Sequence, residues 1–313
     1  MKQRNLGKSG LLVSVVGLGC NNFGGRIGLD ASRLVIDKAI DLGITLFDTA
    51  DVYGERGGSE TIIGEVLGSR RQDIVLATKF CGGMDDAGKL RGASRRYIMT
   101  AVEASLTRLK TDWIDLYQLH SPDPKTPMEE TLRALDDLVR HGKVRYVGCS
   151  NVPAWQVADA HWISTSLGIG GFVSCQDEYS LIVRDVEKEL IPAAKAYGLG
   201  VLPYFPLASG MLTGKYKRDV MPEGARLTTT PRLANRYMTD KNWPIVEALD
   251  AFATERGHTM LELAFSWLAA QPTVSSVIAG ATKPSQVEQN VTAADWELTS
   301  EDLEEIGKIL SPG

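Results

Sequence analysis

Three short apolar runs of the sequence each end on a side chain that could do acid–base chemistry. Residues 46–54 read LFDTADVYG and place Tyr53 five residues after Asp48, while LATK ends on Lys79 and LYQLH ends on His120. A carboxylate that ends an apolar run is costly unless a cation meets it, so we expect Lys79 to pair with Asp48. The ammonium would then stabilise the phenolate of Tyr53 and lower its pKa from about 10 toward working pH.

These residue types fit the reduction of a carbonyl group. Tyr53 would be a usable general acid that protonates the carbonyl oxygen. His120 could hydrogen-bond the same oxygen or hold the substrate in line. A carbonyl reduction without a metal or flavin signature in the sequence needs a hydride source, and nicotinamide is the common one.

The elements that would position these residues alternate regularly along the chain. Short β-rich runs are followed by segments with the apolar period of a helix, as at 98–109 and 128–139. Lys79 follows Asp48 by 31 residues, and the strand ends from His120 to Tyr204 are 26 to 30 residues apart. One strand–helix unit per ~30 residues, repeated eight times, predicts an α/β fold, the (β/α)8 TIM barrel. The predicted strands are 13–18, 45–48, 74–79, 114–119, 144–149, 172–176, 200–204 and 274–278.

We expect residues 1–313 to form a single barrel domain with a long loop after strand seven, at about 206–240. The carboxyl ends of barrel strands lie on one rim, where active sites are built. Taken singly, each polar strand end could be an ordinary turn residue. That interpretation leaves a lysine at the end of a core strand unexplained. The strand ends that would meet are Asp48, Lys79, His120, Ser150 with Asn151, Gln176, Tyr204 and Gly280.

Six motifs, spread in order over nearly the whole chain, resemble those of the aldo-keto reductases. They are FDTADVYG, LATKF, LYQLH, GCSN at 148–151, PLASGMLTGKY at 206–216 and GATKPSQVEQN at 280–290. The resemblance implies an enzyme that reduces an aldehyde or ketone to the alcohol by hydride transfer from NADPH. It also implies a catalytic tetrad of Asp48, Tyr53, Lys79 and His120, with Tyr53 as the proton donor.

The resemblance further implies that NADP(H) lies across the barrel rim. No Rossmann fingerprint offers another site, because GLGCNNF has two of the glycines, misses the third, and opens no helix. Gly280 leads into a helix that begins near Pro284, whose free backbone N–H groups suit a phosphate. Two positions depart from the family pattern: Phe205 replaces a frequent serine, and Gln289 a frequent glutamate.

The implied cofactor contacts divide between the two halves of the dinucleotide. Ser150, Asn151 and Gln176 would hydrogen-bond the carboxamide, and Tyr204 would stack on the nicotinamide ring. Thr282 and Lys283 would bind a 2′-phosphate, which favours NADP(H) over NAD(H). The remaining predicted contacts are Phe205 and Leu207, Lys215 at the pyrophosphate, Gly280, and Gln286, Gln289 and Asn290 toward the adenine.

Composition limits the partners. A formal net charge of −5 argues against nucleic acid, and no apolar run approaches the ~20 residues of a membrane span. The cysteines have no CxxC spacing, so neither a zinc site nor a disulfide framework is indicated. We therefore expect a cytoplasmic protein whose partner is a small-molecule carbonyl substrate; the sequence leaves the oligomeric state open. The four cysteines are Cys20, Cys81, Cys149 and Cys175.

Two other functions would also fit parts of this sequence. A glycoside hydrolase would use Asp48 and Asp51 as paired carboxylates, but strands four and seven end in His120 and Tyr204, which supply no acid. A cofactor-binding regulatory or redox-sensing subunit of the same fold is the stronger alternative. Asp51 itself is expected to be a solvated loop charge. Because the cysteines fall near strand ends, thiol modification could impair cofactor binding, which is a further hypothesis.

Overall fold

The computed structural model, which describes residues 1–311, confirms the predicted barrel. Eight parallel strands pair in the order β10-β3-β4-β5-β6-β7-β8-β9. The two ends of this order meet where the Val201 amide donates to the Thr273 carbonyl and the Ser275 amide donates to the Val201 carbonyl, at 2.8 and 3.0 Å. The strands are β3 (Val16–Gly19), β4 (Leu46–Asp48), β5 (Val75–Phe80), β6 (Ile114–Leu119), β7 (Val144–Ser150), β8 (Ser174–Glu178), β9 (Gly200–Tyr204) and β10 (Val277–Gly280).

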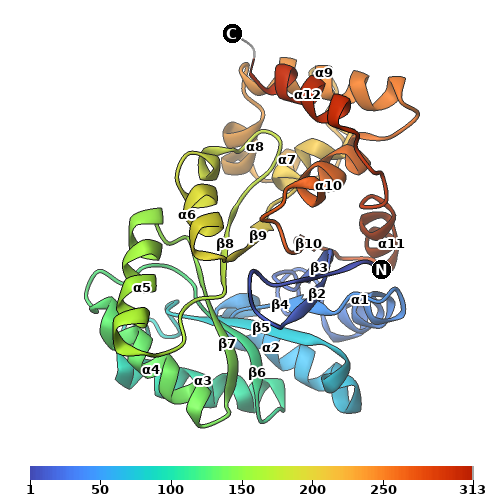
Figure 1. Cartoon of the computed structure of the whole chain (residues 1–313). Coiled ribbons are helices and arrows are strands. Elements are labelled where there is room, and N and C mark those ends of the chain that lie inside the picture. Colours follow the sequence, from blue (N-terminus) through green and yellow to red (C-terminus); the bar gives the residue numbers. More distant parts are fainter. Residues whose placement is uncertain (312–313) are drawn as a thin grey trace.

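Helices alternate with the strands and cover the outside of the barrel (Figure 1). The predicted helical period is confirmed in α3, where Ile98, Val102, Leu106 and Leu109 are buried. The helices are α1 (Leu29–Asp41), α2 (Tyr53–Leu67), α3 (Arg95–Leu109), α4 (Met128–Arg140), α5 (Ala154–Leu167), α6 (Leu190–Tyr197), α9 (Asn242–Glu255), α10 (Met260–Ala270), α11 (Pro284–Thr292) and α12 (Ser300–Leu310). No helix within residues 1–311 is long and apolar enough to cross a membrane.

The first predicted strand, 13–18, proves to be two separate strands. β1 (Gln3–Asn5) and β2 (Leu12–Ser14) form an antiparallel hairpin, and the barrel strand β3 begins only at Val16. The break falls at Val15, next to Ser14, whose hydroxyl donates to the Val16 carbonyl and whose backbone amide donates to Thr45 Oγ1. Strands six and eight also lie two to three residues later than predicted.

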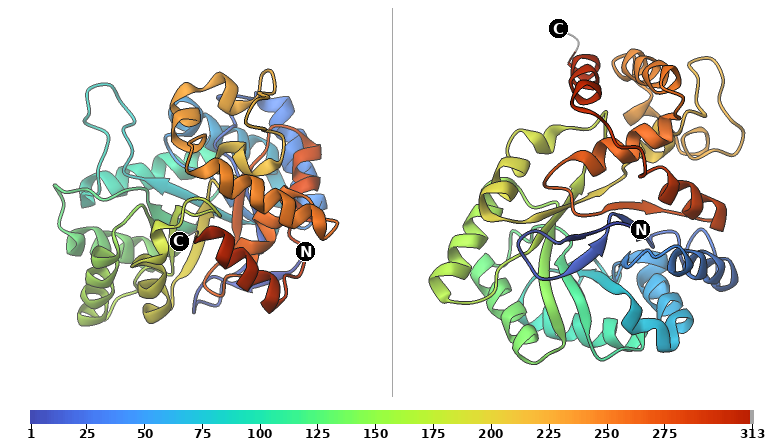
Figure 2. Two further views of the ribbon diagram at one scale, coloured as in Figure 1. Left: turned by 90° about the horizontal axis from the view of Figure 1, so that it is seen from above. Right: turned by 45° about the vertical axis from the view of Figure 1, so that its right-hand side comes forward.

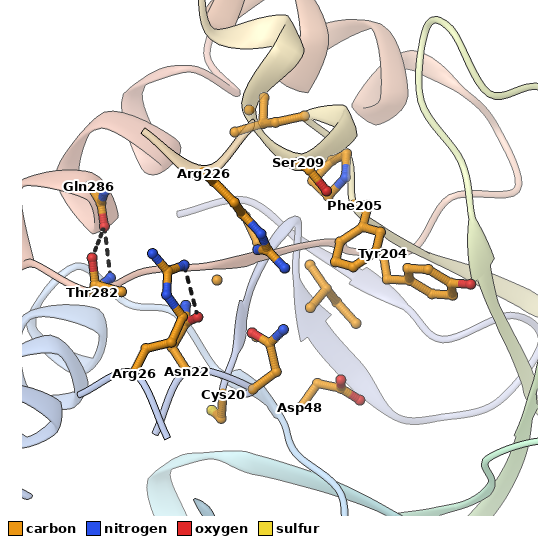
Figure 3. Close-up of a pocket in the computed structure, with 18 of the residues that line it drawn as sticks. Cys20, Asn22, Arg26, Asp48, Tyr204, Phe205, Ser209, Arg226, Thr282 and Gln286 are labelled. Atoms are coloured by element: carbon orange, nitrogen blue, oxygen red, sulfur yellow. Dashed lines mark hydrogen bonds between the residues drawn. The ribbon is translucent and has the colours of Figure 1, made fainter. Parts of the chain in front are cut away.

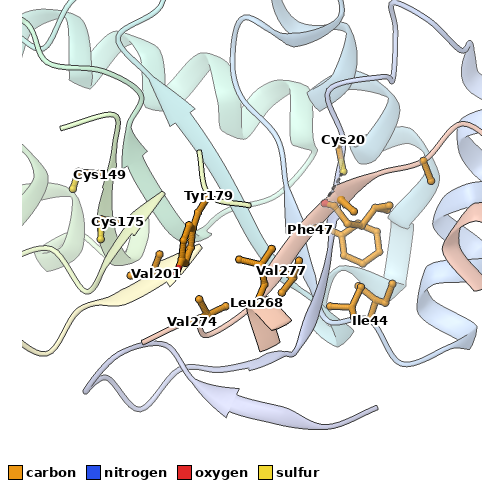
Figure 4. Close-up of a cluster of buried hydrophobic side chains, with 14 of the residues drawn as sticks. Cys20, Ile44, Phe47, Cys149, Cys175, Tyr179, Val201, Leu268, Val274 and Val277 are labelled. Atoms are coloured by element: carbon orange, nitrogen blue, oxygen red, sulfur yellow. Dashed lines mark hydrogen bonds between the residues drawn. The ribbon is translucent and has the colours of Figure 1, made fainter. Parts of the chain in front are cut away.

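Two apolar clusters pack against the strands, one outside the barrel and one inside it. The larger fills the space between barrel and helices and includes Phe47, Val201 and Val277 (Figure 4). The smaller occupies the barrel interior, where Leu6 and Val13 of the hairpin region lie against inward side chains of five strands. The hairpin thus closes the end of the barrel opposite the predicted rim. The strand members of the inner cluster are Leu46, Ala77, Leu116, Leu202 and Ile278.

The predicted long loop after strand seven contains short helices. They are η3 (Ala208–Thr213), α7 (Arg226–Thr229) and α8 (Pro231–Tyr237), and the two predicted longer helices, α9 and α10, follow. Two short 3-10 helices elsewhere are η1 (Gly68–Asp73) and η2 (Asp185–Glu187). The segment from 206 to 240 contacts the C-terminal helices at one side of the barrel: Lys217 pairs with Asp250 of α9, and η3 packs against α10 (Figure 2).

Candidate active site

Several polar residues of the site each follow a residue of the inner apolar cluster by two positions along the strand. Side chains of a strand alternate between its two faces, so a residue two positions after an inward apolar residue also points inward. Leu46 is followed in this way by Asp48, and Ala77 by Lys79. The barrel interior therefore changes from apolar to polar within one layer. The same step places Gln118 after Leu116, Tyr204 after Leu202 and Gly280 after Ile278.

Asp48 and Lys79 form the predicted ion pair inside the barrel. Lys79 Nζ donates to Asp48 Oδ2 at 2.6 Å and to the Thr49 carbonyl at 2.8 Å. The lysine is 0% exposed and the aspartate 4% exposed. Burial opposes the charge on Lys79, but Asp48 and Tyr53 outweigh it, and the pKa of Lys79 is raised. The ammonium therefore stays protonated across the physiological range.

The other oxygen of Asp48 accepts two amide hydrogen bonds. Gln176 Nε2 lies 2.8 Å from Asp48 Oδ1, and Gln118 Nε2 lies 3.1 Å from the same atom. Both glutamines are buried. The carboxylate is thus held by side chains from three further strands, β5, β6 and β8. Gln118 was not among the predicted site residues, although it lies two residues before His120 and therefore on the same face of the strand.

Tyr53 lies next to Lys79, but the predicted fall in its pKa is wrong. The Lys79 ammonium is 5.1 Å from the centroid of the Tyr53 ring. Burial raises the pKa of Tyr53 above 10. The charge of Lys79 lowers this pKa and that of Asp48 raises it, so Lys79 does not cancel the effect of burial. The phenol is therefore protonated at neutral pH. It is a proton donor whose conjugate phenolate has a cation beside it.

His120 is neutral in this environment. Burial, with the charge of Lys79 as a second cause, lowers the pKa of His120 to about 3. Its ring meets that of Tyr53 edge to face, with centroids 5.7 Å apart. A neutral imidazole can donate or accept one hydrogen bond without adding charge to the site. The two rings thus offer two polar groups to one substrate atom.

A cavity of about 620 Å³ opens above these groups and contains most of the predicted cofactor residues. Lys79 lies beneath its floor rather than in its wall. Two predicted adenine contacts are outside it: Gln289 is exposed on α11, and Asn290 is buried. The predicted residues that line the cavity are Asp48, Tyr53, His120, Ser150, Asn151, Gln176, Tyr204, Phe205, Leu207, Lys215, Gly280, Thr282, Lys283 and Gln286.

Two arginines that the sequence analysis missed also line this cavity. Arg26 and Arg226 point into it from different walls (Figure 3). Among residues 1–311, neither guanidinium is within 4.0 Å of a carboxylate. Burial lowers the pKa of Arg226, and the charge of Arg26 adds to this effect. A cavity with two such cations is suited to an anion, and no motif signals it because the two arginines are 200 residues apart in the chain, Arg26 in a turn and Arg226 at the start of the short helix α7.

Comparison with known proteins identifies the family. The model of the Aldo/keto reductase family matches residues 15–311. The chain belongs to the aldo/keto reductase family. It is 39% identical to a probable voltage-gated potassium channel subunit beta of Oryza sativa subsp. japonica, over 94% of this chain and 92% of that protein. It is 35% identical to the uncharacterized oxidoreductase YrpG of Bacillus subtilis, over 100% and 97%.

A third relative also matches nearly the whole chain. A putative voltage-gated potassium channel subunit beta of Schizosaccharomyces pombe is 39% identical over 98% of this chain and 93% of that protein. Membership of the aldo/keto reductase family supports an oxidoreductase that uses a nicotinamide cofactor. Because such a cofactor carries a negatively charged pyrophosphate and a flat nicotinamide ring, the cavity can be tested for its fit.

The rim residues of this aldo/keto reductase fit the nicotinamide end. Tyr204 donates its hydroxyl hydrogen to Asn151 Oδ1 at 2.8 Å, and Asn151 Nδ2 donates to the His120 carbonyl at 3.0 Å. Asn151 adopts φ 57°, which turns its side chain back over the rim. These bonds fix a polar edge beside an aromatic ring. Gln176 keeps its Oε1 for an amide donor because its Nε2 is committed to Asp48.

The opposite end of the cavity fits the phosphates. Lys283 is the N-cap residue of α11, and Pro284 begins the helix. The Thr282 amide and hydroxyl both donate to Gln286 Oε1, at 2.7 and 3.1 Å. The first turn of α11 therefore lies at the cavity with a positive side chain beside it, an arrangement that attracts phosphate. Lys215, which is exposed, adds another cation to this wall.

Asp51 is buried, so the expectation of a solvated loop charge is wrong. It is 1% exposed, and neither carboxylate oxygen has a hydrogen-bond partner among the described residues. Burial, together with the nearby charge of Glu60, raises the pKa of Asp51 to about 7. Its neighbour Glu60 is neutralised by Arg108 at 2.7 Å. Asp51 lies two residues before Tyr53 and is absent from the cavity wall.

The four cysteines are free and buried. Cys20 lines the cavity, whereas Cys149 and Cys175 lie side by side on adjacent strands outside the barrel (Figure 4). Burial raises the pKa of all four thiols. Protonated, buried thiols react slowly. The hypothesis that their modification impairs cofactor binding stays a prediction.

Proposed function

We propose that this protein is an NADPH-dependent reductase that converts an aldehyde or ketone into the alcohol, with Tyr53 as the general acid. The observation that carries the proposal is the buried Lys79–Asp48 pair beneath Tyr53, at the floor of a cavity lined by cations that have no carboxylate partner within residues 1–311. A cationic cavity next to a protonated phenol suits an anionic hydride donor and a neutral carbonyl. We take residues 1–313 to act as one barrel domain, in the cytoplasm.

The chain's own groups would divide the reaction as follows. When bound, NADPH supplies the hydride to the carbonyl carbon. Tyr53 gives its hydroxyl proton to the carbonyl oxygen and becomes a phenolate. Lys79 stabilises that phenolate, and Asp48 keeps Lys79 in place. The neutral imidazole of His120 holds the carbonyl oxygen in line with the phenol.

Preference for NADP(H) over NAD(H) is supported by the number of cations around the cavity. Lys283, Arg26 and Arg226 exceed what a pyrophosphate alone requires, and a 2′-phosphate would provide up to two further negative charges. We propose that Ser150, Asn151 and Gln176 bind the carboxamide and that Tyr204 stacks on the nicotinamide. Phe205, Leu207 and Gly280 would complete the wall, and Gln289 and Asn290 would act only indirectly.

A substrate screen tests this function. Purified protein is mixed with NADPH or NADH and a panel of aldehydes and ketones, and the nicotinamide absorbance is followed. We expect turnover of at least one carbonyl class and a higher kcat/KM with NADPH than with NADH. Binding of NADPH without turnover of any carbonyl would contradict the reductase.

A second function is favoured by the names of two relatives. The proteins from Oryza sativa and Schizosaccharomyces pombe are named as potassium channel subunits. By analogy this chain could bind NADPH, turn over slowly, and report the cofactor's redox state to a protein partner. Single-turnover kinetics separate the two functions: a reductase oxidises bound NADPH and releases NADP+ repeatedly, whereas a sensor retains the oxidised cofactor after one turnover.

A further inference from the structure

Gln118 makes a hydrogen bond that neither the family assignment nor the proposed contacts explain. Its side chain points into the barrel from β6 and is 0% exposed. Gln118 Nε2 lies 3.1 Å from Asp48 Oδ1. Its other amide atom, Oε1, has no hydrogen-bond partner among the described residues. Because a carboxylate only accepts hydrogen bonds, the amide must turn its NH2 group toward Asp48.

An unpaired buried carbonyl is unfavourable, so an apolar residue would fill this position at lower cost. The neighbouring strand also makes room for the glutamine. Gly148 is the register partner of Gln118, and a Cβ at Gly148 would lie 3.3 Å from Gln118 Cγ and 2.5 Å from Ser174 Oγ. The amide oxygen of Gln118 is unsatisfied, and a glycine on the next strand leaves space for its side chain. We take this as a sign that the hydrogen bond to Asp48 has a role in the site.

That bond constrains which way the Asp48 carboxylate faces. Gln118 and Gln176 both donate to Oδ1, which leaves Oδ2 as the acceptor for Lys79 at 2.6 Å. Rotation of the carboxylate would break both amide bonds. We propose that Gln118 is a positioning residue of the catalytic centre, which holds Asp48 so that the ammonium of Lys79 remains against Tyr53. This inference rests on the proposed reductase function.

The variant Gln118→Met tests it, because methionine keeps the length of the side chain and removes the donor. Without the amide dipole, Asp48 exerts a stronger negative field and Lys79 is less well aimed, so both changes raise the pKa of Tyr53. We expect the titration of Tyr53, followed by NMR of protein with 13C-labelled tyrosine rings and assigned with Tyr53→Phe, to move to higher pH. We expect kcat to fall about tenfold, as for the loss of one bond to a charged group, with the NADPH dissociation constant within about twofold.

Gln118→Glu provides a second variant of the same shape. Its carboxyl can donate to Asp48 only while protonated, so we expect partial recovery of kcat at low pH and a loss of kcat over a pH range well below the pKa of Tyr53, where we expect none in the parent protein. Ser174→Ala is the matched control, because Ser174 is buried in the same barrel layer and its hydroxyl has no hydrogen-bond partner, Asp48 included, among the described residues. It should leave both the tyrosine titration and kcat unchanged.

The inference is overturned if Gln118→Met titrates and turns over like the parent, or if Ser174→Ala changes the Tyr53 titration as much as Gln118→Met does. The NMR titration needs no substrate. An inactive parent protein would therefore refute the reductase, while a shifted Tyr53 titration in Gln118→Met would still support the positioning role.

Discussion

At the scale of single residues, the protonation state of each buried acid or base in the site depends on whether a group of opposite charge lies beside it. Lys79 and Asp48 neutralise each other inside the barrel, whereas Asp51 is buried a few residues away without a hydrogen-bond partner among the described residues. Burial wins over the nearby ammonium at Tyr53, and its pKa rises. The role of Lys79 is thus to stabilise the phenolate formed during the reaction rather than to create it beforehand.

Removal of one member of the buried pair should be strongly destabilising. Lys79→Met leaves the Asp48 carboxylate buried with only amide partners, and we expect the free energy of unfolding to fall by about 3–5 kcal/mol. Urea denaturation followed by circular dichroism measures this. As a control, Lys308→Met removes one member of an exposed helix pair with Glu304 and should change stability little. Equal effects of the two variants would show that the inner pair is not desolvated.

Asp51 should make stability depend on pH. Its carboxyl titrates near 3.8 when unfolded and near 7 when folded, so the native state keeps the proton between these values. Stability is therefore full below about pH 4 and is lost as pH rises toward 7, at about 1.4 kcal/mol per pKa unit at most. Asp51→Asn should equal the parent at or below about pH 4 and exceed its stability at pH 8. A difference between the two proteins that does not vary with pH would contradict the buried acid.

At the scale of elements, the two ends of the barrel have different tasks. The hairpin of β1 and β2 seals one end, and the strand ends with α7 and α11 build the cavity at the other. The seal requires Gly7, which adopts φ 58° and lies so close to the chain that a Cβ would be 2.5 Å from the Gly198 carbonyl oxygen and the Gly200 amide. These contacts are backbone, so they cannot yield easily.

Gly7→Ala should therefore lower the melting temperature substantially, because it combines a left-handed backbone with a steric clash. We expect a loss of more than about 2 kcal/mol. Gly307→Ala is the matched control: nothing lies within 4 Å of its Cβ position, and it is in the interior of α12. That change should stabilise the protein by about 0.5–1 kcal/mol. Thermal unfolding of both variants measures these effects. A melting temperature of Gly7→Ala equal to that of the parent would contradict the role of Gly7 in the seal.

Arg226 on α7 should contribute to cofactor selectivity. Arg226→Ala is expected to weaken NADPH binding about tenfold or more, to weaken NADH binding less, and to reduce the dependence of affinity on salt. Fluorescence titration at several ionic strengths measures these effects. Arg232→Ala, an exposed arginine on α8, is the matched control. Similar losses for NADPH and NADH would exclude a role at the 2′-phosphate.

At the scale of the whole molecule, the barrel and its ion pair were predictable from the sequence, whereas the burial and the pKa shifts of individual side chains were not. The 30-residue period and the alternation within strands depend only on local pattern, so they place Asp48, Lys79 and His120 on one rim. The direction of the pKa of Tyr53, the burial of Asp51 and the convergence of Arg26 with Arg226 depend on contacts between segments far apart in the chain. The hairpin was missed because β2 and β3 are separated by a single residue and read as one run.

The most direct test of the central claim is single-turnover kinetics of Tyr53→Phe. Phenylalanine keeps the ring against Lys79 and His120 but has no proton to give. The account predicts that NADPH binds with unchanged affinity while hydride transfer to a carbonyl that the parent reduces slows by about 100-fold or more. Transfer at the parental rate in this variant would show that another group protonates the carbonyl oxygen.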